Sequence, residues 1–147
     1  MVKEMEKEKN IIKEDSGVLS DFFQGTYING EKNGKGYVMD GGYRTLYEGE
    51  YKNDKKNGYG KEYNHDYYLV YEGDFLNGEK NGKIKEYDRE GEYLNGRKHG
   101  KAKEYCFGEL LFEGEYLNGR KHGKAKEYCF GELEFEGEYL NGEKIEE

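Results

Sequence analysis

Charged side chains alternate with aromatic residues or glycine along most of the chain. Residues 112–117, for example, read Phe-Glu-Gly-Glu-Tyr-Leu. A period of two places successive side chains on opposite faces of a β-strand. Asn118-Gly119 follows, and this dipeptide favours the positive φ angles of a tight turn. The pattern therefore predicts a β-hairpin.

The hairpin pattern recurs along the chain. Residues 90–110 and 113–133 are identical, and weaker copies lie on both sides of them. Each repeat has a first marker position and, four residues later, an aromatic residue. The first positions are Phe23, Tyr47, Tyr71, Arg89, Phe112 and Phe135, and the second are Tyr27, Tyr51, Phe75, Tyr93, Tyr116 and Tyr139. The first positions follow one another at intervals of 24, 24, 18, 23 and 23 residues. A recurring spacing of this size indicates stacked repeats. The predicted fold class is all-β, an elongated, twisted antiparallel sheet of about six stacked β-hairpins that forms an open-ended solenoid.

The predicted repeat domain covers residues 22–147, and residues 1–21 lie outside it. This N-terminal arm is rich in charge, and after its first two residues Met5, Ile11 and Ile12 are the sizeable apolar residues up to residue 15. We expect the arm to form a short helix or to be disordered.

Glycines recur at fixed places in each repeat. One follows the turn glycine by four residues, as Gly123 follows Gly119, and this spacing favours a turn of four to six residues. Others, such as Gly25 and Gly49, lie inside predicted strands. Glycine weakens a strand unless another group must come close, so we expect an aromatic ring from a neighbouring strand above the bare backbone.

The composition changes this picture in two ways. Of the 147 residues, 33% are hydrophobic and 38% charged, which favours disorder, but 16 Tyr and 7 Phe supply apolar contacts that disordered chains lack. The net charge of −8 disfavours nucleic acid and acidic lipid as partners. Two Cys and no long apolar segment favour a cytoplasmic location, with cytoskeletal or membrane-associated placement left open.

The candidates for chemistry are few. His99, Cys106, His122 and Cys129 recur at the repeat period, but their spacing matches no zinc pattern. Cys106 and Cys129 would lie about 10 Å apart in register, too far for a disulfide. Hydroxyl nucleophiles in a catalytic setting and phosphate-cradling loops are not recognisable either. The sequence predicts no enzyme, no metal and no cofactor.

Two sets of side chains are candidates for partner binding. Tyr is enriched at interface hot spots, so one set is the aromatic row Tyr27, Tyr51, Phe75, Tyr93, Tyr116 and Tyr139. The other is a basic ridge of turn residues, Arg97, Lys98, Arg120 and Lys121, which could meet acidic headgroups or an acidic partner. The alternative interpretation is that the aromatic rows pack the sheet and that Glu and Lys pair across strands on a solvated face.

These motifs resemble the MORN repeat, whose unit reads roughly Tyr-x-Gly-x-Tyr/Trp-x-Asn-Gly-x-x-x-Gly-x-Gly. Tyr47-Glu-Gly49-Glu-Tyr51-Lys-Asn53 matches closely, followed by Gly58 and Gly60. The resemblance extends from Phe23 to the C-terminus, although Ile84, Ala102 and Ala125 replace the last glycine of the later units. That form is similar to the variant in antitoxin-like bacterial proteins and large protist repeat proteins.

The resemblance implies a scaffold or adaptor that holds a partner protein along an aromatic-lined face. Two other functions stay open, an antitoxin-like protein that neutralises a specific enzyme and a peripheral tether to membrane lipid. Self-association through the end strands is a further possibility. Nucleic acid is not an expected partner.

Overall fold

The computed structural model describes residues 7–14 and 21–146, with side chains from residue 21 onward. Every regular element within these ranges is a β-strand, so the predicted all-β class is confirmed. The chain forms two compact units, Met1–Glu79 and Lys80–Glu147.

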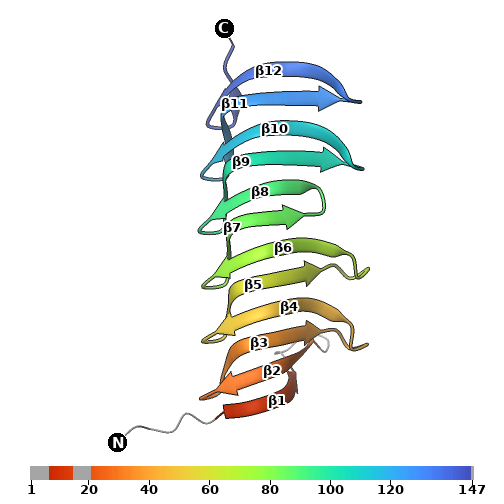
Figure 1. Cartoon of the computed structure of the whole chain (residues 1–147), viewed down its shortest axis with the longest axis vertical. Helices are drawn as coiled ribbons and strands as arrows, with labels where there is room; N and C mark the ends of the chain where they lie inside the picture. The colour runs from red at the N-terminus through yellow and green to blue at the C-terminus, as the bar shows by residue number, and fades with distance from the viewer. Residues whose placement is uncertain (1–6, 15–20, 147) are drawn as a thin grey trace, which may run out of the picture. The chain divides into compact units, whose positions relative to one another are not determined.

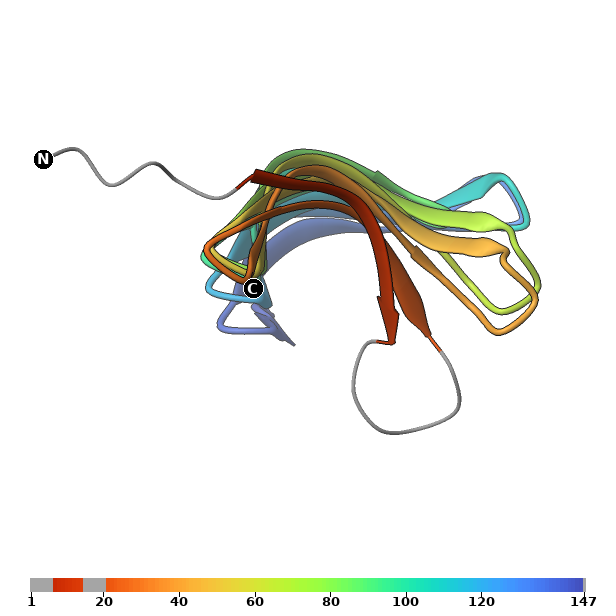
Figure 2. The same cartoon turned by 90° about the horizontal axis from the view of Figure 1, so that it is seen from below.

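Both units are built from antiparallel strands that pair in chain order (Figure 1). The first unit contains β1 (Lys7–Glu14), β2 (Phe22–Ile28), β3 (Glu31–Met39), β4 (Thr45–Lys52), β5 (Lys55–Tyr63) and β6 (Leu69–Leu76). The second contains β7 (Glu79–Glu86) from its second residue onward, β8 (Arg89–Leu94), β9 (Arg97–Cys106), β10 (Glu109–Leu117), β11 (Arg120–Cys129), β12 (Glu132–Leu140) and β13 (Glu143–Lys144). Figure 2 shows that the strands within each unit are bent rather than flat.

The N-terminal segment differs from the expectation of a helix or a disordered arm. Lys7–Glu14 forms β1, which pairs with β2 and places Ile11 opposite Gly25. Two adjacent β-branched residues, Ile11 and Ile12, favour a strand over a helix. The other residues of the predicted arm, apart from Asp21, lie outside the described ranges, so the domain boundary at residue 21 stays a prediction.

The Asn-Gly turns are shorter than predicted. Leu117 pairs with Arg120, which leaves Asn118 and Gly119 as a two-residue connection with φ of 51° and 84°. Positive φ at both central residues defines the type I′ turn, whose twist matches that of the flanking strands. The expectation of a four- to six-residue turn is therefore wrong.

The second glycine forms a bulge inside the following strand instead. Glu113 pairs with Lys126 but Glu115 pairs with His122, so β11 carries two more residues than β10 over this interval. Gly123 lies in that interval with φ of 74°. Since β-bulges bend and twist a strand, this glycine determines strand geometry and not turn length.

The strand glycines accommodate rings, as expected: the Phe23 ring of β2 covers Gly36 on the neighbouring strand and also Gly25 on its own strand. A Cβ atom added to Gly36 would lie 2.4 Å from the Phe23 ring, and one added to Gly25 would lie 2.6 Å from it. Gly25 and Gly36 are paired across β2 and β3. Each first-position ring thus lies flat over a cross-strand pair of small residues, which explains why those positions are Gly or Ala.

Most of the large buried side chains form one row within each unit, and we call this row the aromatic ladder. It consists of the first- and second-position residues of the repeats, with Arg89 in place of one ring. Successive rings meet edge to face, for example Phe23 and Tyr51 at a centroid distance of 5.1 Å and Tyr47 and Phe75 at 5.7 Å. This geometry suits the charge distribution of aromatic rings and adds to the apolar area that they bury.

Candidate partner-binding surfaces

The six aromatic residues predicted to contact a partner lie in the interior of the sheets. Tyr27, Tyr51, Phe75, Tyr116 and Tyr139 are buried, each at most 7% exposed, and Tyr93 is partly buried. The expectation of a solvent-facing aromatic groove at these residues is therefore wrong. They form the core because each unit is a single sheet layer, and these rings supply most of its large apolar side chains.

Lysine side chains cover the outer side of the aromatic ladder. The Lys121 ammonium nitrogen lies 4.1 Å from the centroid of Phe112 and 5.3 Å from that of Tyr139. Lys56 lies between Tyr47 and Phe75 in the same way. An ammonium group over an aromatic face is attracted by the ring quadrupole, so these lysines pack against the aromatic ladder and cover part of it.

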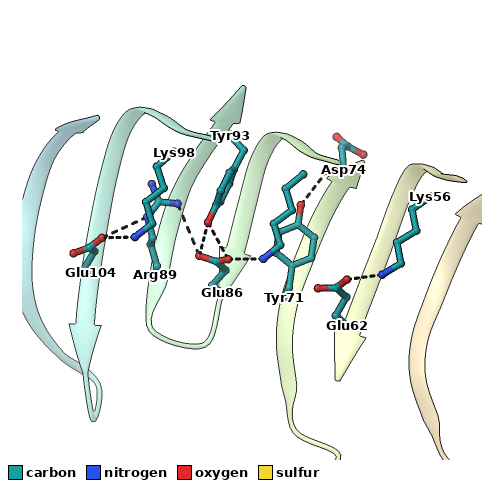
Figure 3. A network of polar contacts seen from close by, with 10 residues as sticks. Lys56, Glu62, Tyr71, Asp74, Glu86, Arg89, Tyr93, Lys98 and Glu104 are labelled. Carbon is teal, nitrogen blue, oxygen red and sulfur yellow. Dashed lines mark hydrogen bonds and ion pairs between the residues drawn. The ribbon is translucent and has the colours of Figure 1, made fainter. Parts of the chain in front are cut away.

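The lysine of each repeat also forms an ion pair with a glutamate six residues further along the chain, and Figure 3 shows this for Lys56–Glu62 and Lys98–Glu104. The distances are 2.6 Å for Lys56–Glu62, 2.8 Å for Lys80–Glu86, 3.3 Å for Lys98–Glu104 and 3.1 Å for Lys121–Glu127. In the second unit the glutamate also accepts a hydrogen bond from a ladder tyrosine, as Glu104 does from the Tyr116 hydroxyl at 2.7 Å. A cluster of Lys, Glu and Tyr thus recurs from repeat to repeat.

The clusters shift the ionisation of their members. Burial, followed by the hydrogen bond to Glu104, raises the pKa of Tyr116, so its hydroxyl stays a donor. Partial burial opposes ionisation of Glu127, but hydrogen bonds from Lys144, Tyr139 and Lys121 outweigh it and lower its pKa to about 2. Near neutral pH the tyrosine therefore stays protonated and the glutamate stays ionised, so these groups are poor candidates for acid–base catalysis.

Arg89 is the one charged member of the aromatic ladder. Its side chain is 2% exposed, lies over Gly91 and faces the rings of Tyr93 and Tyr116, each at 5.2 Å. Its closest carboxylate contact runs from Nε to Glu104 at 3.6 Å, and its three guanidinium nitrogens lack hydrogen-bond partners. Arg89 therefore substitutes for a ring as a flat, stacking group with incomplete polar contacts.

The predicted basic ridge is not assembled as a free surface. Lys98 and Lys121 fold over the aromatic ladder and pair with Glu104 and Glu127, so they belong to the clusters. Arg97 and Arg120 stay exposed at the first positions of β9 and β11. The prediction of four turn cations acting together is wrong, because the strand alternation places neighbouring residues on opposite faces.

The opposite face of the second unit carries ordered rows of charge, and we call it the charged face. Strand register places Glu90 opposite Lys103, Lys103 opposite Glu113, Glu113 opposite Lys126, and Lys126 opposite Glu136. A second row pairs Lys101 with Glu115 and Lys124 with Glu138. The sequence predicts this cross-strand pairing correctly, and the ion pair between Lys126 and Glu136 spans 3.7 Å.

The charged face is also hollowed. A cavity of about 700 Å³ lies between the charged rows. Its floor is the backbone of Gly91, Ala102, Gly114, Ala125 and Gly137, because these residues alternate with the charged ones and face the aromatic ladder on the other side of the sheet. The sequence shows the charges but not the hollow, because the hollow depends on how the strands bend.

The repeated histidines have a structural position. In the earlier repeats the equivalent residue is Asn33, Asn57 or Asn81, and its side-chain oxygen accepts a hydrogen bond from the N–H of the next turn, at 3.2 Å, 3.1 Å and 3.3 Å. His99 and His122 place a buried Nδ1 at this position without a partner. Cys106 and Cys129 are free thiols. Within the described ranges, no group of His, Cys, Asp and Glu side chains is arranged to hold a metal ion.

The fold and these surfaces define a class of repeat protein in which stacked hairpins create extended side-chain rows. The MORN repeat model matches five segments, residues 23–37, 47–66, 71–83, 90–107 and 112–130, and the chain belongs to the MORN-repeat family. The resemblance seen in the sequence is thus confirmed. MORN repeats are commonly modules for protein or membrane interaction and are generally not enzymes. No curated protein matches the chain. The described residues include no helix long and apolar enough to cross a membrane.

Proposed function

We propose that this chain is a non-enzymatic scaffold that binds a partner protein across the charged face of its second unit. The observation that carries the proposal is the pair of alternating Glu and Lys rows on the two sides of a hollow floored by Gly and Ala. The floor is bare backbone between the charged rows, so a partner segment can approach the sheet closely there, and the rows supply charges that fix its orientation.

The spacing of the rows indicates what kind of segment would fit. Neighbouring strands are about 4.8 Å apart, so opposite charges alternate at that distance and like charges recur at about 10 Å. A helix rises 1.5 Å per residue. A partner helix laid across the strands would match the row if Lys and Glu alternated every three to four residues along it. The scaffold function is thus assigned to the charged face and not to the buried aromatic ladder.

Protein is favoured over lipid as the partner. The net charge is −8, and Lys98 and Lys121 are occupied by ion pairs and aromatic rings. Acidic membranes attract clusters of accessible Lys and Arg, and the described surface offers only Arg97 and Arg120 of the predicted ridge. A specific enzyme neutralised by this chain would be one case of such a protein partner.

The test compares the two units of one chain. Wild type, a Lys103→Gln/Lys126→Gln variant and a Lys35→Gln/Lys61→Gln control are used to capture proteins from the native source. The first pair lies on the charged face, and Lys61 lies at the equivalent place in the first unit. We expect wild type and the control to retain the same stoichiometric partner and the Lys103/Lys126 variant to lose it while staying folded by circular dichroism. Equal retention by all three chains would contradict the assignment to the charged face.

A further inference from the structure

A second surface lies at the hairpin tips opposite the Asn-Gly turns of the second unit. Cys106 pairs with Glu109, and Cys129 pairs with Glu132, so each tip is a two-residue turn, Phe107-Gly108 or Phe130-Gly131. The two phenylalanine side chains are 95% and 89% exposed. Among the described residues, neither ring takes part in an aromatic or cation–π contact, so the two rings do not contribute to the packing of the aromatic ladder.

The backbone at these tips is unfavourable for phenylalanine. Phe107 and Phe130 have φ of 49° and 48°, followed by Gly108 and Gly131 at 82° and 79°. These are type I′ turns, in which the first central residue is preferably Asn, Asp or Gly. At the opposite edge the chain uses Asn at the same turn position, with φ of 49° to 51°. Two large rings are therefore held in a strained conformation and turned to solvent.

The surroundings of the two rings are acidic. Residues 104–111 and 127–134 contain five glutamates and neither Lys nor Arg. Glu104 and Glu127 are paired with lysines, whereas Glu109, Glu132 and Glu134 are exposed. The two tips thus present two apolar rings with three exposed glutamates close to them in sequence, Glu109, Glu132 and Glu134, and we call these glutamates the acidic collar. A ring alone would suit a bilayer, but the acidic collar repels anionic headgroups.

We propose that Phe107 and Phe130, with Glu109, Glu132 and Glu134, form a docking surface for a basic amphipathic helix of a partner protein. The two hairpins are two strands apart, which sets the turns about 10 Å apart. Residues seven apart on a helix are separated by about 10.5 Å on the same face. Apolar residues at such positions contact the two rings, and flanking Lys or Arg face the glutamates. This surface is separate from the charged face and does not depend on it.

The test uses a designed helical peptide with apolar residues at positions i, i+3, i+4 and i+7 and lysines on both flanks. A matched peptide carries Glu in place of Lys, and vesicles of zwitterionic and of anionic lipid are the membrane probes. The central variant is Phe107→Asn/Phe130→Asn, which restores the residue that this turn prefers and is expected to melt no lower than wild type. Glu109→Gln/Glu132→Gln/Glu134→Gln removes the collar charge.

We expect the lysine peptide to bind wild type, more weakly as salt rises, and the glutamate peptide not to bind. The double Asn variant should weaken binding at least about tenfold, as loss of hot-spot rings does, and the triple Gln variant should flatten the salt dependence. The Lys103→Gln/Lys126→Gln variant should bind the lysine peptide like wild type, which separates this surface from the charged face. The proposal is overturned if the lysine peptide does not bind, if the double Asn variant binds it equally, or if the rings bind vesicles instead.

Discussion

At the scale of single residues, one position of the aromatic ladder holds a charged side chain instead of an aromatic ring. Position 89 holds Arg where the equivalent residues are Phe or Tyr, and the guanidinium lies flat over Gly91 as the rings do over their glycines. Its carboxylate contacts are long, at 3.6 Å and 4.0 Å. Glu86 and Glu104 already have closer lysine partners, at 2.8 Å and 3.3 Å. Arg89 is therefore a buried charge with weak compensation.

Replacing Arg89 with Phe should stabilise the second unit by about 1 kcal/mol or more, because a buried ion group exchanged for a well-packed apolar one is often stabilising. The measurement is the midpoint of urea unfolding followed by far-ultraviolet circular dichroism. Arg89→Ala is the matched control and should destabilise, because it leaves space beside Tyr93 and Tyr116. A loss of stability in Arg89→Phe would show that the contacts with Glu86 and Glu104 outweigh the cost of burying the charge.

At the scale of the hairpin, neighbouring repeats are joined turn to turn. The N–H of Gly119 donates to the Lys98 carbonyl at 2.8 Å, and the N–H of Gly142 donates to the Lys121 carbonyl at 2.8 Å. In the earlier repeats an Asn side chain adds a second bond to the following turn. Where His99 and His122 replace that Asn, a buried nitrogen is left without a partner. The last repeats are thus joined less completely than the first.

We expect His99→Asn and His122→Asn each to raise stability by about 1 kcal/mol, since each restores a hydrogen bond and removes an unsatisfied buried group. Thermal unfolding followed by circular dichroism measures the effect. Asn81→His provides the reverse control and should lower the melting temperature. If both His→Asn variants melt below wild type, the ring packing of the histidines matters more than the missing bond.

The Lys-Glu-Tyr cluster at Glu127 gives the second unit an acid-dependent stability. The folded-state pKa of Glu127 lies near 2, below its ordinary value of 4.5. A lowered pKa stabilises the folded state above the unfolded-state value, and this contribution disappears as pH falls from about 4.5 toward 2. At pH 7 Glu127→Gln should therefore be less stable than wild type, and the difference should shrink across that window.

Urea unfolding at pH 7, 4.5, 3 and 2 measures this difference. Glu136→Gln is the control, because its ion pair with Lys126 is exposed and contributes little. A difference between wild type and Glu127→Gln that stays constant from pH 7 to pH 2 would contradict the assignment.

At the scale of the whole molecule, stability is distributed over the repeats of each unit. A repeat contacts mainly its neighbours, so a local loss of packing spreads only a short distance. The chain divides into two compact units, 1–79 and 80–147. We therefore expect a core substitution to destabilise mainly the unit in which it lies.

Phe112→Ala should therefore act mainly on the second unit. It removes a side chain that is 2% exposed and should destabilise that unit by about 3–5 kcal/mol. Hydrogen exchange resolved by mass spectrometry should become faster in β9 to β12 and change little in β2 to β5. Phe23→Ala is the mirror control and should have the opposite distribution. Equal acceleration across both units would show that the chain unfolds as one cooperative block.

The sequence by itself determined the hairpins and their number. Period-two alternation, the recurring Asn-Gly pairs and the identical 21-residue segments act over a few residues, and such signals survive without tertiary context. The same signals gave the Glu–Lys pairing of the charged face, since a regular register follows from regular repeats.

Only the tertiary structure decided how those hairpins are used. The spacing of Gly119 and Gly123 fits a long turn as well as a two-residue turn with a bulge, and the pairing of β10 with β11 selects the second. The alternation also separates an aromatic face from a charged face, but it does not say whether the sheet's own packing or a partner covers the aromatic face. Enclosure by neighbouring repeats placed the aromatic ladder inside, left the charged face hollow, and exposed Phe107 and Phe130 at the tips.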